Sequence, residues 1–261
     1  MSIQDRDTID TEKEQPALLR EWQAFWLALG FLSRIPMLAR IDYSQRLMNQ
    51  SSLYFPLVGL LLGALYAATF TVLALLWPSH VALLLVLCGH LWLTGAFHED
   101  GLADSADALG GGMSVAQRLT IMKDSRIGTY GAVALIGALS LKFALLGSLE
   151  AIWLGLLLAP CIARLAPLLL MWWLPYVTDP TLSKSKPVAE GFSGTRLLLA
   201  IGLVAMVAGV SQTMVWALVA VTIVVVFWGF TLKRLLGGYT GDTLGASVIL
   251  AEIAFLLLLL I

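Results

Sequence analysis

The chain has 261 residues, of which 59% are hydrophobic and only 13% are charged, and its formal net charge at pH 7 is −1. A soluble domain of this length cannot bury so much apolar surface, so the composition excludes an ordinary soluble protein. The balanced charge gives no basis for a nucleic-acid partner. We therefore expect an all-α fold, a polytopic bundle of membrane-spanning helices.

The residues before the first apolar segment are polar and acidic. They lack the order of basic and then apolar residues that marks a cleaved signal peptide. We interpret residues 1–17 as a disordered acidic tail and residues 18–261 as a single transmembrane domain.

Residues 18–33 are too short and too polar at their start for a convincing membrane span. Trp22, Phe25 and Trp26 are among the apolar residues that recur at helical spacing on one face of this segment. The pattern predicts a helix that lies in the inner membrane interface and ends before Pro36. A re-entrant segment is the alternative.

A helix needs about 20 mostly apolar residues to cross the hydrocarbon core of a bilayer. The apolar segments that meet or approach this length lie near residues 53–77, 79–97, 129–149, 151–174, 196–211, 213–232 and 246–261. The fifth and the last are short, which predicts tilted or partly interfacial helices. The sequence therefore predicts six or seven transmembrane helices.

The Lys and Arg residues test the orientation of these helices. If the N-terminus is cytoplasmic, the inner side receives residues 1–52, 98–128, 175–195 and 233–245. Every Lys and Arg except Lys142 and Arg164 then falls on that side or at an inner helix end. This asymmetry follows the positive-inside rule and predicts that the long polar loops face the cytoplasm.

The stretch FHEDGLADSADALGGG, residues 97–112, places a cluster of acids at the end of the second apolar segment. If that helix continues, Asp100, Asp104 and Asp107 have the spacing i, i+4 and i+7 and share one face. Like charges at this spacing repel, and a divalent cation would remove the repulsion. Oxygen ligands suit a hard ion such as Mg²⁺. A solvated acidic loop is the weaker alternative, and we interpret His98 as a structural, hydrogen-bonded residue.

A second polar group, MKDSRIGTYGA, follows at residues 122–132. Lys123 and Arg126 flank Asp124 and Ser125 just before the glycines that open the next apolar segment. Cations, a hydroxyl and backbone N–H groups at a helix N-terminus suit a phosphate. The alternative is that these cations only follow the positive-inside rule.

The third group is LLGGYTGDTLGA at residues 235–246. Its glycines surround Thr240 and Asp242 at an inner helix end. A tight turn there can bring backbone close to an anion and add one more carboxylate to the others. A plain glycine-rich turn between two helices is equally compatible with the sequence.

Two cations lie inside apolar segments, and each is expected to face the bundle interior and to pair with an acid or an anion. Arg164 suits a substrate phosphate, because a guanidinium can bind phosphate bidentately. Lys142 lies toward the outer half of its segment, and we expect a structural pair with Glu150.

These motifs together resemble those of the cobalamin synthase family, the adenosylcobinamide-GDP ribazoletransferases. The resemblance covers nearly everything after residue 25 and includes FLSRIPM, YFPLVGLLLG, FHEDGLADSADAL, IMKDSRIGTYGAVAL, Arg164 and GGYTGDTLGA. The aspartate motif and the MKDSRIGT motif are specific. The resemblance implies a catalytic domain in the bacterial cytoplasmic (inner) membrane, with its active site facing the cytoplasm.

The family resemblance implies a Mg²⁺-dependent reaction that joins adenosylcobinamide-GDP to α-ribazole or α-ribazole 5′-phosphate and releases GMP. Asp100, Asp104 and Asp107 are the implied catalytic acids, and Asp107 is assigned as the base. Metal binding is assigned to Asp100, Asp104 and Asp242, with Glu99 as an outer ligand. The implied substrate- and phosphate-binding residues are Lys123, Asp124, Ser125, Arg126, Gly128, Arg164 and Thr240.

The expected partners are the two substrates and membrane lipid, without nucleic acid. A homo-oligomer, or an association with other enzymes of cobalamin assembly, is left open. A wider likeness is to the CDP-alcohol phosphotransferases, but Phe97 stands where their motif has an Asp, and Ala103-Asp104 replaces their Ala-Arg pair. A divalent-cation transporter would carry acids at mid-depth in several spans, whereas the apolar segments hold few besides Glu252.

Overall fold

The computed structural model describes residues 16–38, 40–41, 43–177 and 193–261, so the acidic tail expected at the N-terminus lies almost wholly outside the described residues. The helices in chain order are α1 (Ala17–Leu32), α2 (Gln45–Ser51), the 3-10 helix η1 (Ser52–Tyr54), α3 (Phe55–Leu73), α4 (Ser79–Thr94), α5 (Phe97–Gly111), α6 (Val115–Met122), α7 (Thr129–Ser148), α8 (Ile152–Ala163), α9 (Leu165–Trp173), α10 (Gly194–Val210), α11 (Met214–Leu235) and α12 (Gly241–Leu258). The described residues contain no β-strand, which confirms the all-α prediction.

Several of these helices are long and apolar enough to cross a membrane. The five segments that qualify alone are Gln45–Leu73, Thr129–Ser148, Ile152–Trp173, Met214–Leu235 and Gly241–Leu258. α4 and α5 qualify together, as a pair bent by 84°, and would supply a sixth span. α10 is apolar but has only 17 residues. The described part of the chain therefore holds five or six candidate spans, at or just below the lower end of the prediction.

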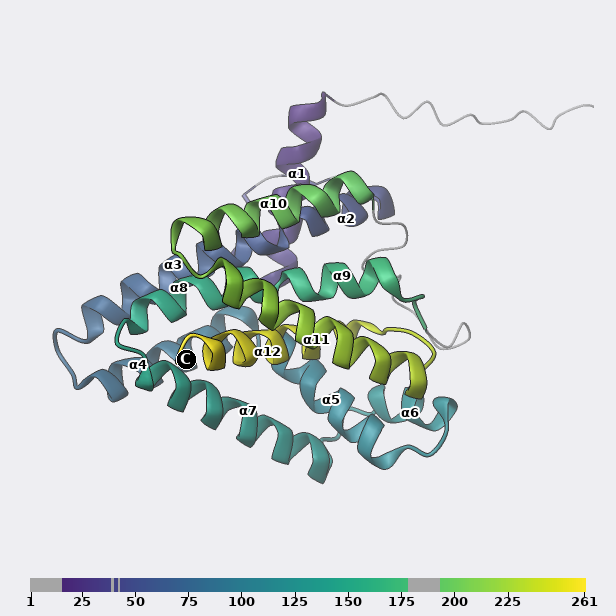
Figure 1. Ribbon diagram of the computed structural model, residues 1–261. Helices are drawn as coiled ribbons and strands as arrows, with labels where there is room; N and C mark the ends of the chain where they lie inside the picture. The colour runs from purple at the N-terminus through teal and green to yellow at the C-terminus, as the bar shows by residue number, and fades with distance from the viewer. Residues whose placement is uncertain (1–15, 39, 42, 178–192) are drawn as a thin grey trace, which may run out of the picture.

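α8 and α12 lie at the centre of the bundle, with α3, α5, α7 and α11 around them (Figure 1). α12 is buried along most of its length, and its small residues Gly245, Ala246 and Ser247 let neighbouring helices approach closely. α3 packs against α8 in the same way, because a side chain at Gly59 or Gly63 would clash with the α8 backbone. Small residues therefore set which helices meet at the centre.

The junction between α4 and α5 is a sharp corner. Gly95 has a φ of 69° and Ala96 a φ of 54°, so two consecutive residues adopt the left-handed conformation that ends a helix. The acidic stretch is helical as predicted, but its helix does not continue α4. The corner turns α5 away from α4 and gives the acids a short helix of their own.

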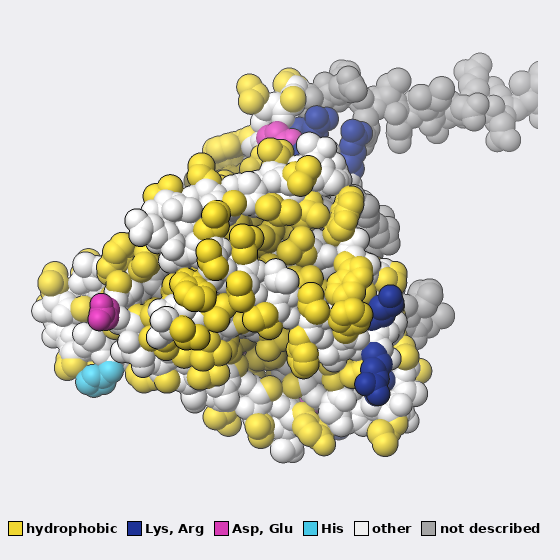
Figure 2. Space-filling model, in the orientation of Figure 1, with side chains coloured by type: hydrophobic (Ala, Val, Ile, Leu, Met, Phe, Trp, Pro, Cys, Tyr) yellow, Lys and Arg dark blue, Asp and Glu magenta, His cyan; other side chains and the backbone are white. Residues whose placement is uncertain are grey.

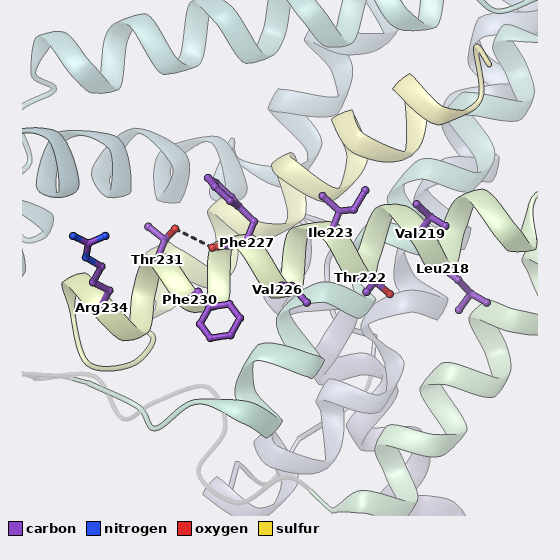
Figure 3. Close-up of a pocket in the computed structure, with 9 residues that line it drawn as sticks. All are labelled: Leu218, Val219, Thr222, Ile223, Val226, Phe227, Phe230, Thr231 and Arg234. Carbon is purple, nitrogen blue, oxygen red and sulfur yellow. Dashed lines mark hydrogen bonds between the residues drawn. The ribbon is translucent and has the colours of Figure 1, made fainter.

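The outer face of α11 is apolar. Figure 2 shows a molecular face covered mainly by hydrophobic side chains, with Lys and Arg at its margins. Figure 3 shows a shallow groove along α11 that ends at Arg234. The Thr231 hydroxyl on this face donates to the Phe227 carbonyl at 2.9 Å, so it is satisfied within its own helix. A face of this kind suits contact with lipid.

The bundle interior contains a buried ion pair between α7 and α12. Lys142 is 5% exposed and Glu252 is 1% exposed. The Lys142 ammonium donates to Glu252 Oε2 at 2.5 Å. Lys142 therefore pairs with Glu252 and not with Glu150 as predicted, because α12 passes beside α7 at this depth while Glu150 lies beyond the end of α7.

A second ion pair joins α1 to α10. The Glu21 carboxylate accepts hydrogen bonds from the Arg196 guanidinium and, at 2.8 Å, from the Tyr54 hydroxyl. Arg196 also donates to the Gln50 carbonyl at 2.9 Å. Burial raises the pKa of Glu21, but the hydrogen bonds from Arg196 and Tyr54 outweigh burial and hold that pKa below its usual value. The pair fixes the helix predicted near the N-terminus onto the bundle.

We expect Glu21→Gln to lower the free energy of unfolding by about 1 to 2 kcal/mol near neutral pH. A carboxyl whose pKa is lowered by folding contributes stability above its unfolded pKa and loses it as the pH falls through the folded pKa. The melting temperatures of wild type and variant in detergent should therefore converge below about pH 4. The control is Glu150→Gln at an exposed position. A constant difference across this pH range would show that the ion pair is not the cause.

Candidate active site

The acid cluster is assembled from two helices, α5 and the start of α12. A Cβ at Gly101 would lie 2.6 Å from the Asp242 carbonyl oxygen, so only glycine lets α12 come this close to α5. The charges of Asp100, Asp242 and Asp107 all act on the half-buried Asp104 carboxylate. The structure therefore brings the third sequence group beside the first, with several like charges in one place.

The N-terminus of α12 is held by a capping box. The Thr240 hydroxyl accepts the Thr243 N–H at 3.3 Å, and the Thr243 hydroxyl accepts the Thr240 N–H at 2.8 Å. Thr240 is buried by this arrangement. Its observed contacts fix the position of Asp242 two residues later, while the phosphate-binding role predicted for Thr240 stays a prediction.

Asp107 reaches from α5 to the N-terminus of α7. Its carboxylate accepts the Gly128 N–H at 2.7 Å and the Gly131 N–H at 2.9 Å. Any side chain at either glycine would collide with this carboxylate. Asp107 thus caps α7 from another helix, where a negative charge favours the positive end of the helix dipole. The Gly128 N–H, predicted to meet a phosphate, is bonded to Asp107.

We expect Asp107→Asn to lower the free energy of unfolding by about 1 to 3 kcal/mol. The amide oxygen can accept one of the two N–H groups, but the amide nitrogen faces the other and leaves it unsatisfied. The measurement is thermal unfolding in detergent, beside Asp124→Asn as a control on the exposed loop. An unchanged melting temperature for Asp107→Asn would contradict the capping role.

Glu99 turns away from the acid cluster into the bundle. It is 4% exposed, and its Oε1 lies 3.1 Å from His90 Nε2. His90 Nδ1 in turn lies 3.0 Å from the Tyr66 hydroxyl. These contacts join α3, α4 and α5 across the corner and fix how α5 is rotated about its axis. We did not select His90 from the sequence, although a histidine within an apolar span is a usable signal.

The loop between α6 and α7 carries the second sequence group on the surface. Arg126 binds Asp124 through both carboxylate oxygens, with Nε to Oδ1 at 3.0 Å and Nη2 to Oδ2 at 2.6 Å. This guanidinium holds the pKa of Asp124 at about 2. Lys123 and Ser125 are exposed beside them. The loop therefore presents its cations to solvent, with Arg126 already engaged by a carboxylate.

Arg164 lies at the break between α8 and α9 and is only 1% exposed. Its Nη1 donates to the Pro160 carbonyl at 2.7 Å. Arg164 lines a small cavity together with His98 and Gly241. The interior position predicted for this cation is thus observed, close to the acid helix and to the start of α12.

The ligand atoms of the acid cluster indicate whether it suits Mg²⁺. Within the described residues, no three His, Cys, Asp or Glu side chains already converge on one point. Asp100 is exposed, and Asp104 and Asp242 are half-buried, so rotation of the side chains can bring their oxygens together. The Asp100 and Asp104 carboxylates have no hydrogen bond to any described residue. All-oxygen donors with free lone pairs and mutual repulsion fit a hard divalent cation.

Known proteins match this chain along nearly its whole length. A family model for cobalamin-5-phosphate synthase matches residues 24–260. Three relatives carry the name adenosylcobinamide-GDP ribazoletransferase. The protein of Vibrio parahaemolyticus is 43% identical over 96% of this chain and 97% of its own length. The protein of Shewanella pealeana is 43% identical over 93% and 98% of the two chains.

The third relative, from Vibrio cholerae, is 43% identical over 94% of this chain and 96% of its own length. No solved structure matches the chain. The family match spans nearly all of the described bundle, including α5, α7 and α12, which carry the acid cluster and the cap. The chain therefore belongs to the cobalamin-5-phosphate synthase family.

Proposed function

We propose that this chain is an adenosylcobinamide-GDP ribazoletransferase. It transfers the adenosylcobinamide-phosphate moiety of adenosylcobinamide-GDP to α-ribazole or α-ribazole 5′-phosphate and releases GMP. The observation that supports this most directly is the meeting of Asp100 and Asp104 on α5 with Asp242 on α12, in a chain of this family. A diphosphate substrate needs such a site for its metal ion.

The reaction is a substitution at phosphorus. A hydroxyl of the ribazole attacks the phosphorus attached to the cobinamide arm, the bond from this phosphorus to the GMP oxygen breaks, and the hydroxyl proton passes to a carboxylate. Asp107 stays our proposed acceptor of this proton, because two bonded N–H groups leave further lone pairs on its oxygens. Catalysis of this type depends mainly on positioning and on neutralising charge.

Asp100, Asp104 and Asp242 would hold Mg²⁺, which when bound neutralises charge on the diphosphate and on the leaving GMP. Lys123 and Arg126 lie on the exposed loop before α7 and can contact phosphate oxygens from solvent. The contacts among Tyr66, His90 and Glu99 hold α5 in the orientation that directs Asp100 and Asp104 toward the proposed metal site. The residues of the chain thus position the diphosphate while the acceptor hydroxyl approaches.

We further propose that the site faces the cytoplasm from the bacterial inner membrane. α5, α6 and the C-terminal end of α11 lie at the same end of the bundle (Figure 1). Lys233 and Arg234 form the last turn of α11 at that end. Basic residues favour the cytoplasmic side of a membrane. Both substrates are charged and soluble, so access from this side agrees with their chemistry.

The test uses purified protein in detergent with adenosylcobinamide-GDP, α-ribazole 5′-phosphate and Mg²⁺. The expected result is one GMP released for each adenosylcobalamin 5′-phosphate formed, with both products measured by mass spectrometry. Omission of the acceptor should stop GMP release, and so should Asp100→Ala. GMP release without an acceptor would indicate hydrolysis instead of transfer. Turnover of a CDP-alcohol in place of these substrates would redirect the assignment to lipid head-group transfer.

A further inference from the structure

Arg164 is a buried cation with unused donors. Its Nε and Nη2 have no hydrogen-bond partner among the described residues, while Nη1 donates to the Pro160 carbonyl of its own helix. A guanidinium that is 1% exposed loses much hydration, and unpaired N–H groups add to that cost. Such a residue is expected to meet an anion in some state of the protein.

Arg164 lines a cavity that lies at the N-termini of α5 and α12. Phe97 and His98 come from the first turn of α5, and Gly241 is the first residue of α12. The remaining lining residues are apolar, with no carboxylate among them. Each helix N-terminus carries partial positive charge. The cavity is therefore lined by the Arg164 guanidinium and by the positive ends of two helices, without a carboxylate that offsets this charge.

The cavity lies close to the acid cluster but is separate from it. Gly241 directly precedes Asp242, and a Cβ at Gly245 would lie 3.4 Å from the His98 Cα and 3.6 Å from the Gly101 Cα. The cavity volume of about 40 Å³ corresponds to a few water molecules and not to a nucleotide. Two of its lining residues, Phe97 and Gly241, are exposed, so the cavity lies near the surface. A single anionic group attached to a larger molecule can enter from there.

We infer that this cavity, the Arg164 cavity, is a subsite for one phosphoryl group of a substrate, an inference that rests on the proposed function. The phosphoryl group comes from one of two sources, the 5′-phosphate of α-ribazole 5′-phosphate or the diphosphate of the donor. In either case Arg164 and the α12 N-terminus bind it. Arg164 would thus bind a phosphoryl group beside the proposed metal site.

The test compares Arg164→Gln with wild type, using α-ribazole and α-ribazole 5′-phosphate as alternative acceptors. Loss of a charged phosphate contact lowers the affected kcat/KM by about 10- to 100-fold. If the acceptor phosphate binds there, only the phosphorylated acceptor loses kcat/KM. If the donor phosphate binds there, kcat/KM falls equally with both acceptors. The KM of the donor then rises, and product inhibition by GMP weakens.

Gly241→Ala gives a second variant that does not alter the buried cation. A Cβ at Gly241 meets no atom within 4 Å, so the fold accommodates the methyl group at the cavity opening. We expect the same substrate selectivity as for Arg164→Gln, with a smaller decrease in kcat/KM. Arg234→Gln, on the exposed face of α11, is the matched control and should keep wild-type kinetics.

A binding measurement without turnover completes the test. Inorganic phosphate should raise the melting temperature of the wild type and of Arg234→Gln, but not that of Arg164→Gln. Unchanged kinetics in both cavity variants, or an equal phosphate response in all proteins, would overturn the inference and leave the cavity as a hydration site. Because wild-type GMP release is measured in the same assay, failure of the subsite and failure of the proposed function give different results.

Discussion

Asp104→Asn is expected to lower the kcat of GMP release by about 10²- to 10³-fold. In the absence of metal, the variant should be at least as stable as the wild type. The reason is electrostatic. Asp104 is half-buried and has the charges of Asp100, Asp242 and Asp107 nearby. An amide removes one repelling charge, but it also removes a ligand from the proposed metal site.

Two measurements separate these effects. Thermal unfolding in EDTA reports the repulsion, and Asp104→Asn should melt at or above the wild-type temperature. Added Mg²⁺ should raise the melting temperature of the wild type much more than that of the variant, because a ligand that binds only the folded state stabilises it. The control is Glu150→Gln, an exposed acid distant in sequence. A clear loss of stability for Asp104→Asn in EDTA would mean that the carboxylate has a structural partner.

Lys142→Met is expected to destabilise the protein by about 3 to 5 kcal/mol, because it leaves Glu252 buried without its partner. Both residues lie deep in the bundle, and their contact joins α7 to α12. The double variant Lys142→Met with Glu252→Met should recover most of the loss, since it removes both charges and fills similar volume. The ion pair also neutralises Glu252, the main carboxylate within the apolar segments. This neutralisation argues against a cation-transport pathway that uses Glu252.

The measurement is unfolding in detergent for the two single variants and the double variant, which together form a double-mutant cycle. Recovery in the double variant identifies the pair as the cause. Equal destabilisation in the single and double variants would contradict this account and would indicate lost packing instead of an uncompensated charge.

Hydropathy and charge asymmetry predicted the class of fold because they depend on local composition. The helix at Ala17–Leu32 and the spans along α7, α11 and α12 fall close to the predicted segments. The corner before α5 was not predicted, because the left-handed conformation of Ala96 is not favoured by its residue type. Backbone geometry at a single alanine depends on what surrounds it.

The candidate site was predictable residue by residue, but its assembly was not. Spacing alone placed Asp100 and Asp104 on one helical face, whereas their proximity to Asp242 depends on packing of α12 against Gly101. Lys142 was assigned the wrong partner because sequence distance favoured Glu150, while the fold brings Glu252 beside it. Pairings between distant segments are set by tertiary structure, which periodicity does not encode.

Mn²⁺ binding measured by electron paramagnetic resonance tests most directly whether acids from α5 and α12 hold one divalent cation. Purified wild-type protein should bind Mn²⁺ at one site that Mg²⁺ displaces, and Asp242→Asn should lose this site although it leaves α5 unchanged. Full Mn²⁺ binding by Asp242→Asn, or undiminished GMP release by the wild type in excess EDTA, would contradict this assignment.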